Sequence, residues 1–486
     1  MFRSQIKPLQ WAVMFAVLFY FLHMIALPVS MTYDGVIYVH LAEILGTTRF
    51  PAEWTVPRTP LFPLLLKLSF WLLGRQPLAV IFLSSTLGLF STLLLGRIAV
   101  MTAGRAAGVV TLVVISLYPT YIAYQHFALT EAGSSFFLVG ITALLIWTPQ
   151  TGRSLWGKAF LLMVFLTGAW HWRQALLFLA PVVAIIYGAD NWRNIFGRLG
   201  GNTALRVRPF WGGAFAISAQ LLLIGYIPFV LAKPWQAIVH DEEVAAIMID
   251  HGILRQVLIP PEDPFIGNIR DDYRNAIDDS LFEGNFYSGL RPDLLRSIQE
   301  KLSTRPYPEP HKQFFWHSIQ RYPGRYFQAL GRTLVLFAGA KAQSNENHPS
   351  TRIVLSPENH WISRQADGPP DITPPIRADL TQYTKPNAIS GFLWTLAPAY
   401  YWLVQLGSLI SLLGLICGLI LRERSIVIIT VVPLVYLFFA AVLLVSIDRY
   451  AFPAYPAIIA NIFLVPILAI RRIRDRLGRT RLTVRG

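Results

Sequence analysis

The chain has 486 residues, of which 54% are hydrophobic and only 14% are charged, and its mean hydropathy is +0.47. This composition excludes an ordinary soluble globular domain and is typical of a protein that crosses a membrane many times. The formal charge of +15 is not the footprint of a nucleic-acid-binding protein, because Lys and Arg gather in loops between apolar segments, where they mark topology and attract anionic lipid headgroups. The single cysteine, Cys417, excludes a disulfide framework and a cysteine-based metal site.

Apolar runs near the ~20 residues needed to cross hydrocarbon predict an all-α polytopic membrane protein with about ten spans. The predicted spans are 9–30, 79–100, 107–125, 131–148, 158–171, 173–188, 211–232, 396–420, 425–446 and 450–470. We interpret the first run as a retained helix and not a signal peptide, because it is long, rich in aromatic residues and lacks a small-residue cleavage site.

The Lys and Arg content of successive loops alternates. The basic parts are the N-terminus, 97–105, 153–158, 193–208, 422–424 and the tail 471–485. The opposite connections, 126–130, 171–173 and 446–450, carry almost no positive charge except Arg173 and Arg449. The positive-inside rule therefore predicts that both termini are cytoplasmic. A bacterial inner membrane fits these features, and an endoplasmic reticulum membrane is the alternative.

The predicted organisation has four parts. These are an N-terminal transmembrane module 1–232, an extracytoplasmic segment 233–395, C-terminal transmembrane helices 396–470 and a basic cytoplasmic tail 471–486. The first outer loop, 31–78, contains a predicted short helix at 35–45. A second apolar stretch at 61–73 is too short to span, so it predicts a juxtamembrane or re-entrant helix.

The extracytoplasmic segment holds most of the acidic residues. Its predicted helices are 240–258, 291–303 and 311–330, and 342–390 is predicted to be mainly loop because it is rich in Pro, Asn and Asp. The moderately apolar stretch 324–341 is interpreted as an amphipathic helix at the membrane surface, with Arg325 and Arg332 toward headgroups. If it crossed the membrane instead, every later segment would be inverted.

Polar residues interrupt the apolar chain at four places, and all four fall on the predicted outer side. They are Asp34 with Arg58, Glu131, Arg173, and Asp448 with Arg449. An ionisable group at the centre of a membrane helix costs about 2.5–3.5 kcal/mol on insertion scales. A set gathered at one level therefore predicts a functional site with a recess that contains both arginines and carboxylates.

Each of these residues also has a purely structural interpretation. Asp34 could be the N-cap of the helix that follows it, and Glu131 could serve only to complement a helix dipole. Arg58 could extend toward headgroups. Asp448 and Arg449 could form a local ion pair. Trp170 and Trp172 are expected to be interfacial anchors.

Several short motifs add to this pattern. Tyr38 and Ala42 follow Asp34 at helical spacing, and residues 58–66 read Arg-Thr-Pro-Leu-Phe-Pro-Leu-Leu-Leu. Leu-Thr-Glu ends at Glu131, residues 449–456 read Arg-Tyr-Ala-Phe-Pro-Ala-Tyr-Pro, and 322–327 read Tyr-Pro-Gly-Arg-Tyr-Phe. Over roughly 30–190 and 310–470 the chain resembles membrane glycosyltransferases that use polyprenyl-phosphate sugars, in particular the protein mannosyltransferase and aminoarabinose transferase group with the GT-C fold.

The resemblance implies a role for each matching position. Asp34 is the candidate catalytic carboxylate and Glu131 a candidate second acidic group. Arg58 and Arg173 are candidates to hold the donor phosphate, and Arg449 is a candidate for donor-side binding. Many members of the group carry a second acidic residue directly after the first, whereas here Gly35 follows Asp34. This departure weakens an interpretation based on adjacent carboxylates or a metal.

The predicted function is therefore transfer of a sugar from a polyprenyl-phosphate donor to an acceptor at the extracytoplasmic face. The chain has no Asp-x-Asp motif, which favours a lipid-linked donor over a soluble nucleotide sugar. No cofactor is required by the sequence, and a divalent metal stays open. The expected partners are the lipid-linked donor and membrane lipids, with no nucleic acid; a lipid, a glycan or a protein could be the acceptor.

Two other functions fit the same topology. A transporter or flippase of a lipid-linked glycan should show related halves and charges near the bilayer midplane, and the sequence shows neither. A non-catalytic assembly protein built on the same fold differs from the transferase only in lacking activity.

Overall fold

In a computed structural model of the chain, the residues described are 7–50, 53, 58–148, 152–197, 207–239, 257–282, 310–339, 354–355, 380, 382, 385–442 and 451–483. Within these ranges the secondary structure is helical, with only two isolated β-bridges and no β-strand. The predicted all-α class is confirmed. The predicted helices at 240–258 and 291–303, and most of the loop at 342–390, lie outside the described residues.

The chain forms two compact units. The first combines Met1–Trp235, Ala342–Tyr436 and Phe452–Gly486, and the second combines Gln236–Lys341 with Leu437–Ala451. The four charged residues described below all belong to the first unit.

The first unit is a helical bundle. Its N-terminal helices are α1 (Lys7–Ala26), α2 (Tyr33–Ile44), α3 (Leu61–Leu73), α4 (Pro77–Ala103), α5 (Arg105–Ser116), α6 (Pro119–Gln125), α7 (Glu131–Ile146) and α8 (Gly152–Trp172). After the 3-10 turn η1 (Gln174–Leu176) come α9 (Leu179–Gly197), α10 (Val207–Gly225) and α11 (Ile227–Val239). The C-terminal helices are α19 (Ala388–Leu421), α20 (Arg424–Val442), η7 (Phe452–Ala454) and α21 (Tyr455–Thr483). The last residues of α11, after Trp235, and of α20, after Tyr436, belong to the second unit.

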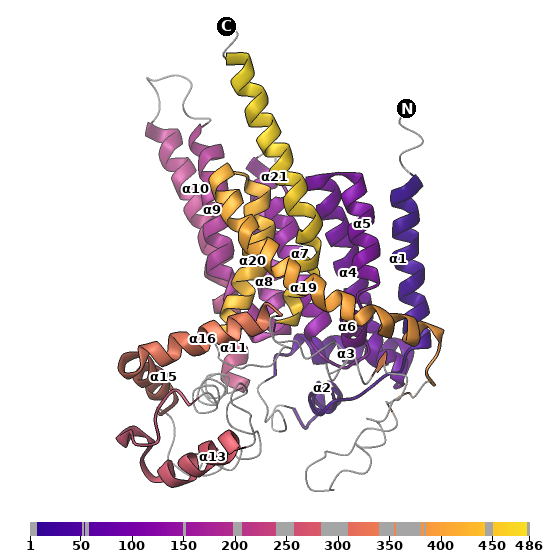
Figure 1. Cartoon of the computed structure of the whole chain (residues 1–486), viewed down its shortest axis with the longest axis vertical. Helices are drawn as coiled ribbons and strands as arrows, with labels where there is room; N and C mark the ends of the chain where they lie inside the picture. The colour runs from indigo at the N-terminus through magenta and orange to yellow at the C-terminus, as the bar shows by residue number, and fades with distance from the viewer. Residues whose placement is uncertain are drawn as a thin grey trace. The chain divides into compact units, whose positions relative to one another are not determined.

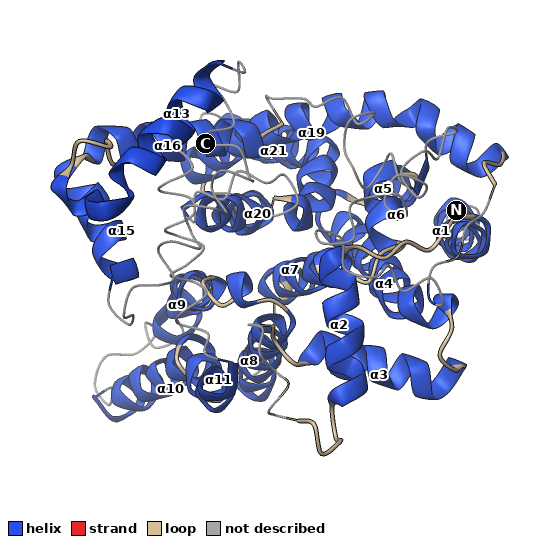
Figure 2. Cartoon of the chain, turned by 90° about the horizontal axis from the view of Figure 1, so that it is seen from below, coloured by secondary structure: helices blue, strands red, loops and turns tan. Residues whose placement is uncertain are grey.

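The ends of the bundle differ. Figure 1 shows that the start of α1 and the end of α21 lie at one end, while α2 and α3 lie at the other. Seen from that second end, α2 and α3 lie across the tips of the bundle helices, which are viewed end-on (Figure 2). The loop connections after α1 and before α7 are therefore brought together at the end that carries α2 and α3.

Six helices are long and apolar enough to cross a membrane, and a bent pair could form a seventh span. The six are Pro8–Ala26, Pro77–Ala103, Ala216–Pro234, Ala388–Leu421, Arg424–Val442 and Phe452–Leu477. These helices indicate an integral, multi-pass membrane protein. Shorter apolar helices, among them Glu131–Ile146 and Leu179–Asn191, account for part of the difference from the predicted ten. The count of ten therefore stays a prediction.

Two predicted spans are discontinuous. The segment 107–125 is two helices, α5 and α6, bent by 59°, and the break falls just before Pro119, which has no amide hydrogen for the ladder of α5. The segment 173–188 begins as the 3-10 turn η1, and α9 starts only at Leu179. Both breaks lie near the end of the bundle that carries α2.

Close helix packing relies on glycine. At Gly407 of α19 a Cβ atom would lie 2.5 Å from the backbone oxygen of Ile458 in α21. Only a residue without a side chain permits this approach of the two helices.

Asn387 starts α19 with a capping box, in which its side chain accepts hydrogen bonds from the backbone amides of Ile389 and Ser390.

The second unit contains η3 (Pro264–Ile269), α13 (Arg270–Phe282), α15 (Pro310–Arg321) and α16 (Pro323–Phe337). The predicted single helix 311–330 is therefore wrong, because Pro323 disfavours helical geometry at Tyr322, whose φ and ψ are −130° and 51°. With 15 residues, α16 is not among the helices long enough to span. Its position at the membrane surface stays a prediction.

Candidate active site

Asp34 lies in the first turn of α2 but does not cap it. The cap is Thr32, whose Oγ1 accepts a hydrogen bond from the Gly35 amide at 3.1 Å. The interpretation of Asp34 as an N-cap is therefore wrong. Its negative charge still benefits from the helix dipole, and its carboxylate is left to meet a guanidinium.

That guanidinium belongs to Arg58. Its Nη2 donates to Asp34 Oδ1 at 2.5 Å, with the two side chains 28% and 16% exposed. The Arg58 guanidinium carbon also lies 5.6 Å from the centre of the Tyr38 ring, one turn along α2, in cation–π contact. Arg58 is thus held over α2 by its contacts with Asp34 and Tyr38.

Glu131 is the first residue of α7 and is completely buried. Its Oε1 accepts from Nη1 of Arg173 at 3.4 Å. Arg173 follows directly on the last residue of α8 and has an extended backbone, with φ −157° and ψ 120°. The pair therefore joins the start of one helix to the end of another.

Trp172 packs next to the Glu131–Arg173 pair and holds the backbone before Glu131 in place. Its indole Nε1 donates to the Thr130 carbonyl at 2.7 Å, immediately before Glu131, and its ring contacts Phe62 edge-on at 5.0 Å. A Cβ at Gly133 would overlap the indole. Trp172 and Trp170 are both fully buried, so the expectation that they are interfacial anchors is wrong.

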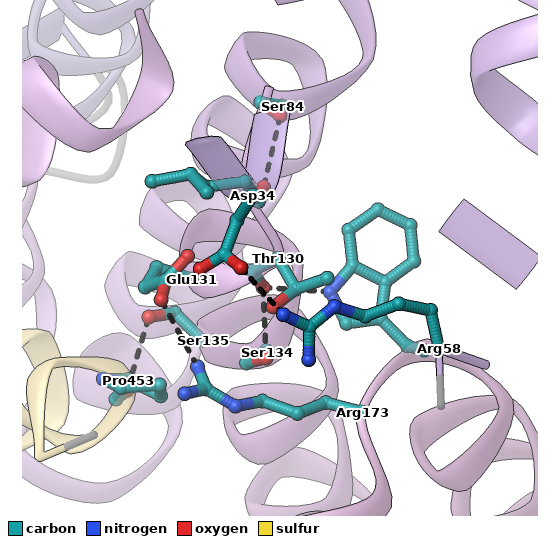
Figure 3. A network of polar contacts seen from close by, with 11 residues as sticks. Asp34, Arg58, Ser84, Thr130, Glu131, Ser134, Ser135, Arg173 and Pro453 are labelled. Carbon is teal, nitrogen blue, oxygen red and sulfur yellow. Dashed lines mark hydrogen bonds and ion pairs between the residues drawn. The ribbon is translucent and has the colours of Figure 1, made fainter. Parts of the chain in front are cut away.

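The two ion pairs lie side by side. Figure 3 shows the carboxylates of Asp34 and Glu131 pointing toward one another, with the Arg58 and Arg173 guanidinium groups reaching in from two other segments. The structure thus brings together four of the five residues that the sequence singled out. The fifth, Arg449, lies outside the described residues together with Asp448.

Tyr38 is part of this cluster, and no role was predicted for its hydroxyl. Burial raises the pKa of the Tyr38 hydroxyl; Arg58 and Arg173 oppose the rise, and Asp34 and Glu131 add to it. The signal in the sequence was its position one turn after Asp34.

The C-terminal helices also reach the cluster. Ser135, one turn after Glu131, donates through Oγ to the Pro453 carbonyl of η7 at 3.0 Å (Figure 3). The start of α21 is thereby attached to α7 beside the two ion pairs.

The donor set does not fit a resident divalent metal. Asp34 and Glu131 each face an arginine, so a cation would have to displace a guanidinium from each carboxylate. In the ranges that the structure describes, no group of three or more His, Cys, Asp or Glu side chains could hold a metal.

The chain matches no known family model and no curated protein. Among solved structures it is similar to the archaeal oligosaccharyltransferase AglB from Archaeoglobus fulgidus, in complex with an inhibitory peptide and a dolichol-phosphate, with 13% identity and a TM-score of 0.42 over 99% of this chain and 51% of that one. It is also similar to ArnT from Cupriavidus metallidurans bound to undecaprenyl phosphate, with 12% identity and a TM-score of 0.35 over 93% of this chain and 77% of that one. The chain thus spans about half the length of AglB.

Proposed function

We propose that the protein is a glycosyltransferase that moves a sugar from a polyprenyl-phosphate donor to an acceptor at the extracytoplasmic face. The observation that carries the proposal is the meeting of Asp34–Arg58 with Glu131–Arg173 at one end of the bundle. Two acids and two guanidinium groups offer a base for the acceptor and positive charge for a phosphate.

In the proposed reaction, an acceptor hydroxyl or amine attacks the anomeric carbon of the sugar. The new bond forms at that carbon as the bond to the phosphate oxygen breaks, and Asp34 takes the acceptor proton. The polyprenyl phosphate departs with the electron pair of the broken bond. Fixed guanidinium groups stabilise the charge that grows on it.

The Asp34–Arg58 ion pair implies an order for the steps of the proposed reaction. While Arg58 binds Asp34, the carboxylate is a weaker base because its charge is compensated. A donor phosphate competes for the same guanidinium, which forms bidentate contacts with phosphate. Donor binding would therefore release Asp34 to act as the base. Glu131, completely buried against Arg173, would hold the second guanidinium in position.

The test is transfer from a labelled polyprenyl-phosphate sugar by the full chain in lipid membranes. We expect Asp34→Asn to express normally and to lower transfer by about 10²- to 10⁴-fold, the usual contribution of a general base. The matched control is Glu43→Gln, because Glu43 lies on the same helix and pairs with Arg75 at 2.9 Å. Near-normal transfer by Asp34→Asn would contradict the catalytic role.

The same assay separates the other functions. Donor binding without transfer by the unaltered protein would favour the non-catalytic assembly protein. Movement of intact labelled lipid between leaflets, without transfer, would favour a flippase. The extracytoplasmic position of the site is part of the proposal.

A further inference from the structure

Two buried histidines lie in or next to the segments that lead to the candidate active site, and the proposed reaction does not use them. His23 belongs to the last turn of α1, and His126 follows α6. His23 is 3% exposed and His126 not at all. Nδ1 of His23 lies 3.1 Å from Nε2 of His126, and Nδ1 of His126 lies 3.0 Å from the Pro28 carbonyl oxygen.

The Pro28 carbonyl fixes the direction of these hydrogen bonds. A carbonyl oxygen only accepts, so His126 Nδ1 must carry the proton and donate. Both rings are buried, where a charge is costly, and a neutral imidazole has one donor and one acceptor nitrogen. His23 Nδ1 therefore donates to His126 Nε2. His23 Nε2 carries no proton and is the free acceptor at the start of this hydrogen-bond chain.

A small cavity, lined partly by polar side chains, lies beside His23, where this hydrogen-bond chain starts. Its volume is about 20 Å³, and its polar lining is Tyr20, His23, Thr92, Ser116, Tyr121 and Gln125. Oε1 of Gln125, a residue only 3% exposed, and Oγ of Ser116 have no hydrogen-bond partner among the described residues. A buried water needs roughly 10–15 Å³ and two to four polar partners. One water here could donate to His23 Nε2 and Gln125 Oε1 and accept from Ser116.

The histidines also join the two chain segments that lead to the carboxylates. Residues 27–32 lead into α2 and Asp34, and residues 126–130 lead into α7 and Glu131. The Ser30 amide donates to the His126 carbonyl at 3.0 Å, and Ser30 and Phe127 form a parallel β-bridge. Further along, Gly35 packs so closely on Ala128 that a Cβ would lie 3.3 Å from the Ala128 methyl.

We propose that this cavity binds an ordered water and that His126 is a positioning residue which sets the spacing between Asp34 and Glu131. The hydrogen-bond chain runs from the water through His23 and His126 to the Pro28 carbonyl. It holds the segment before α2 against the segment before α7, so that the two acids face the same bound donor. The positioning role rests on the proposed transferase function, whereas the water and the hydrogen-bond direction do not.

The first experiment tests the hydrogen-bond chain without any activity. In ¹⁵N-histidine-labelled protein in lipid nanodiscs, the nitrogen spectrum should place the proton of His23 and His126 on Nδ1, with assignments made by His23→Gln and His126→Gln. A water-edited spectrum should give a signal at His23 Nε2. A proton on Nε2 of His126, or no water signal at His23, would overturn the proposal.

The second experiment measures donor kinetics. His126→Leu removes both hydrogen bonds and should lower kcat by about 10- to 100-fold, the scale of a misplacement near 1 Å, with donor KM little changed. His126→Asn should recover most of kcat, because its amide can donate in place of Nδ1. The control is Thr102→Val, which removes a buried hydrogen bond from the Thr102 hydroxyl to the Ile98 carbonyl at 2.8 Å. Thr102 lies in the last turn of α4, and this variant should leave kcat unchanged.

Unchanged kcat in His126→Leu, or an equal loss in His126→Asn, would overturn the positioning role. If the unaltered protein transfers no sugar at all, the proposed function fails. The ¹⁵N-histidine and water-edited spectra then still decide whether the hydrogen-bond chain from the cavity to Pro28 exists.

Discussion

Glu131 Oε1 and Arg173 Nη1 lie 3.4 Å apart where α7 begins and α8 ends, and both side chains are nearly excluded from solvent. Such a pair costs little only while both charges are present, because desolvation of either ion is expensive. It is more deeply buried than the neighbouring Asp34–Arg58 pair, so it supports the site as well as forming part of it.

Loss of Arg173 should therefore destabilise the protein more than loss of both charges. We expect Arg173→Ala to lower the unfolding free energy by about 3–5 kcal/mol, the usual cost of breaking a buried pair. Glu131→Gln combined with Arg173→Ala should recover part of that loss, because no carboxylate charge is then buried. Thermal unfolding in detergent gives the comparison. Arg75→Ala is the control, since its pair with Glu43 is partly exposed, and a double variant no more stable than Arg173→Ala would contradict this account.

Arg58 should act mainly on donor binding. Arg58→Ala removes a charged hydrogen-bond donor, worth about 1.5–3 kcal/mol, so donor KM should rise by roughly 10- to 100-fold. Arg58→Lys keeps the charge but loses the planar fork and its contact with the Tyr38 ring, and an intermediate KM is expected. Steady-state transfer at varied donor concentration measures both. If KM stays at the unaltered value in Arg58→Ala, Arg58 does not hold the donor phosphate.

Gly35 allows α2 to lie close to the 126–130 segment. A Cβ at this position would lie 3.3 Å from the Ala128 methyl and 3.5 Å from the Ala128 carbonyl, so an acidic side chain there would push α2 away from the 126–130 segment. Gly35→Ala should lower kcat, and Ala128→Gly in the same chain should restore it by making room. Gly391→Ala, with open space around it, is the control. A Gly35→Ala enzyme with full kcat would show that this contact does not set the site.

The parts of the fold that follow from local chemistry could be predicted. The helix predicted at 61–73 is present with those bounds as α3, because Pro60 precedes it and Gly74, with φ 77°, ends it. The break at Tyr322 could also have been foreseen from Pro323, but the apolar periodicity across 311–330 concealed it.

Contacts between distant segments could not be predicted. The charge pattern indicated a shared site, but nothing in it says that Arg58 meets Asp34 while Arg173 meets Glu131, since one partner is 24 and the other 42 residues away. Thr32 and Asp34 are both good N-caps, and only the geometry shows that Thr32 is used. His23 and His126, 103 residues apart, carry no local sign of their contact.

Removal of divalent metal should not abolish transfer. Each acid of the cluster faces a guanidinium, so positive charge for a departing phosphate is already supplied by side chains. We expect protein treated with a chelator, then assayed with the chelator present, to keep most of its rate. The control is the same preparation with Mg²⁺ or Mn²⁺ added back. A rate that disappears with chelator and returns with metal would show that the arginines yield their carboxylates to an ion.

In the second unit, Asp263 should make stability depend on pH. Its Oδ2 accepts from His317 Nε2 at 3.0 Å and from the Tyr322 hydroxyl at 2.7 Å, and its Oδ1 accepts from the Phe265 amide at 2.8 Å. Burial alone would raise the pKa of this carboxyl, but the hydrogen bonds outweigh it and lower the pKa from 3.8 to about 2. The folded state thus favours the carboxylate, and its contribution is present above the unfolded pKa and is lost as pH falls toward 2.

The measurement is the pH dependence of thermal unfolding, followed by tryptophan fluorescence, in the unaltered protein and in Asp263→Asn. The gap in melting temperature should be constant from neutral pH to about 4 and should shrink between about 4 and 2, as the carboxyl of the unfolded chain and then that of the folded chain take up protons. Asp271→Asn, an exposed acid in the first turn of α13, should show no such gap. A difference between Asp263→Asn and the unaltered protein that is the same at pH 7 and near pH 2 would mean that the carboxylate charge is not what these hydrogen bonds stabilise.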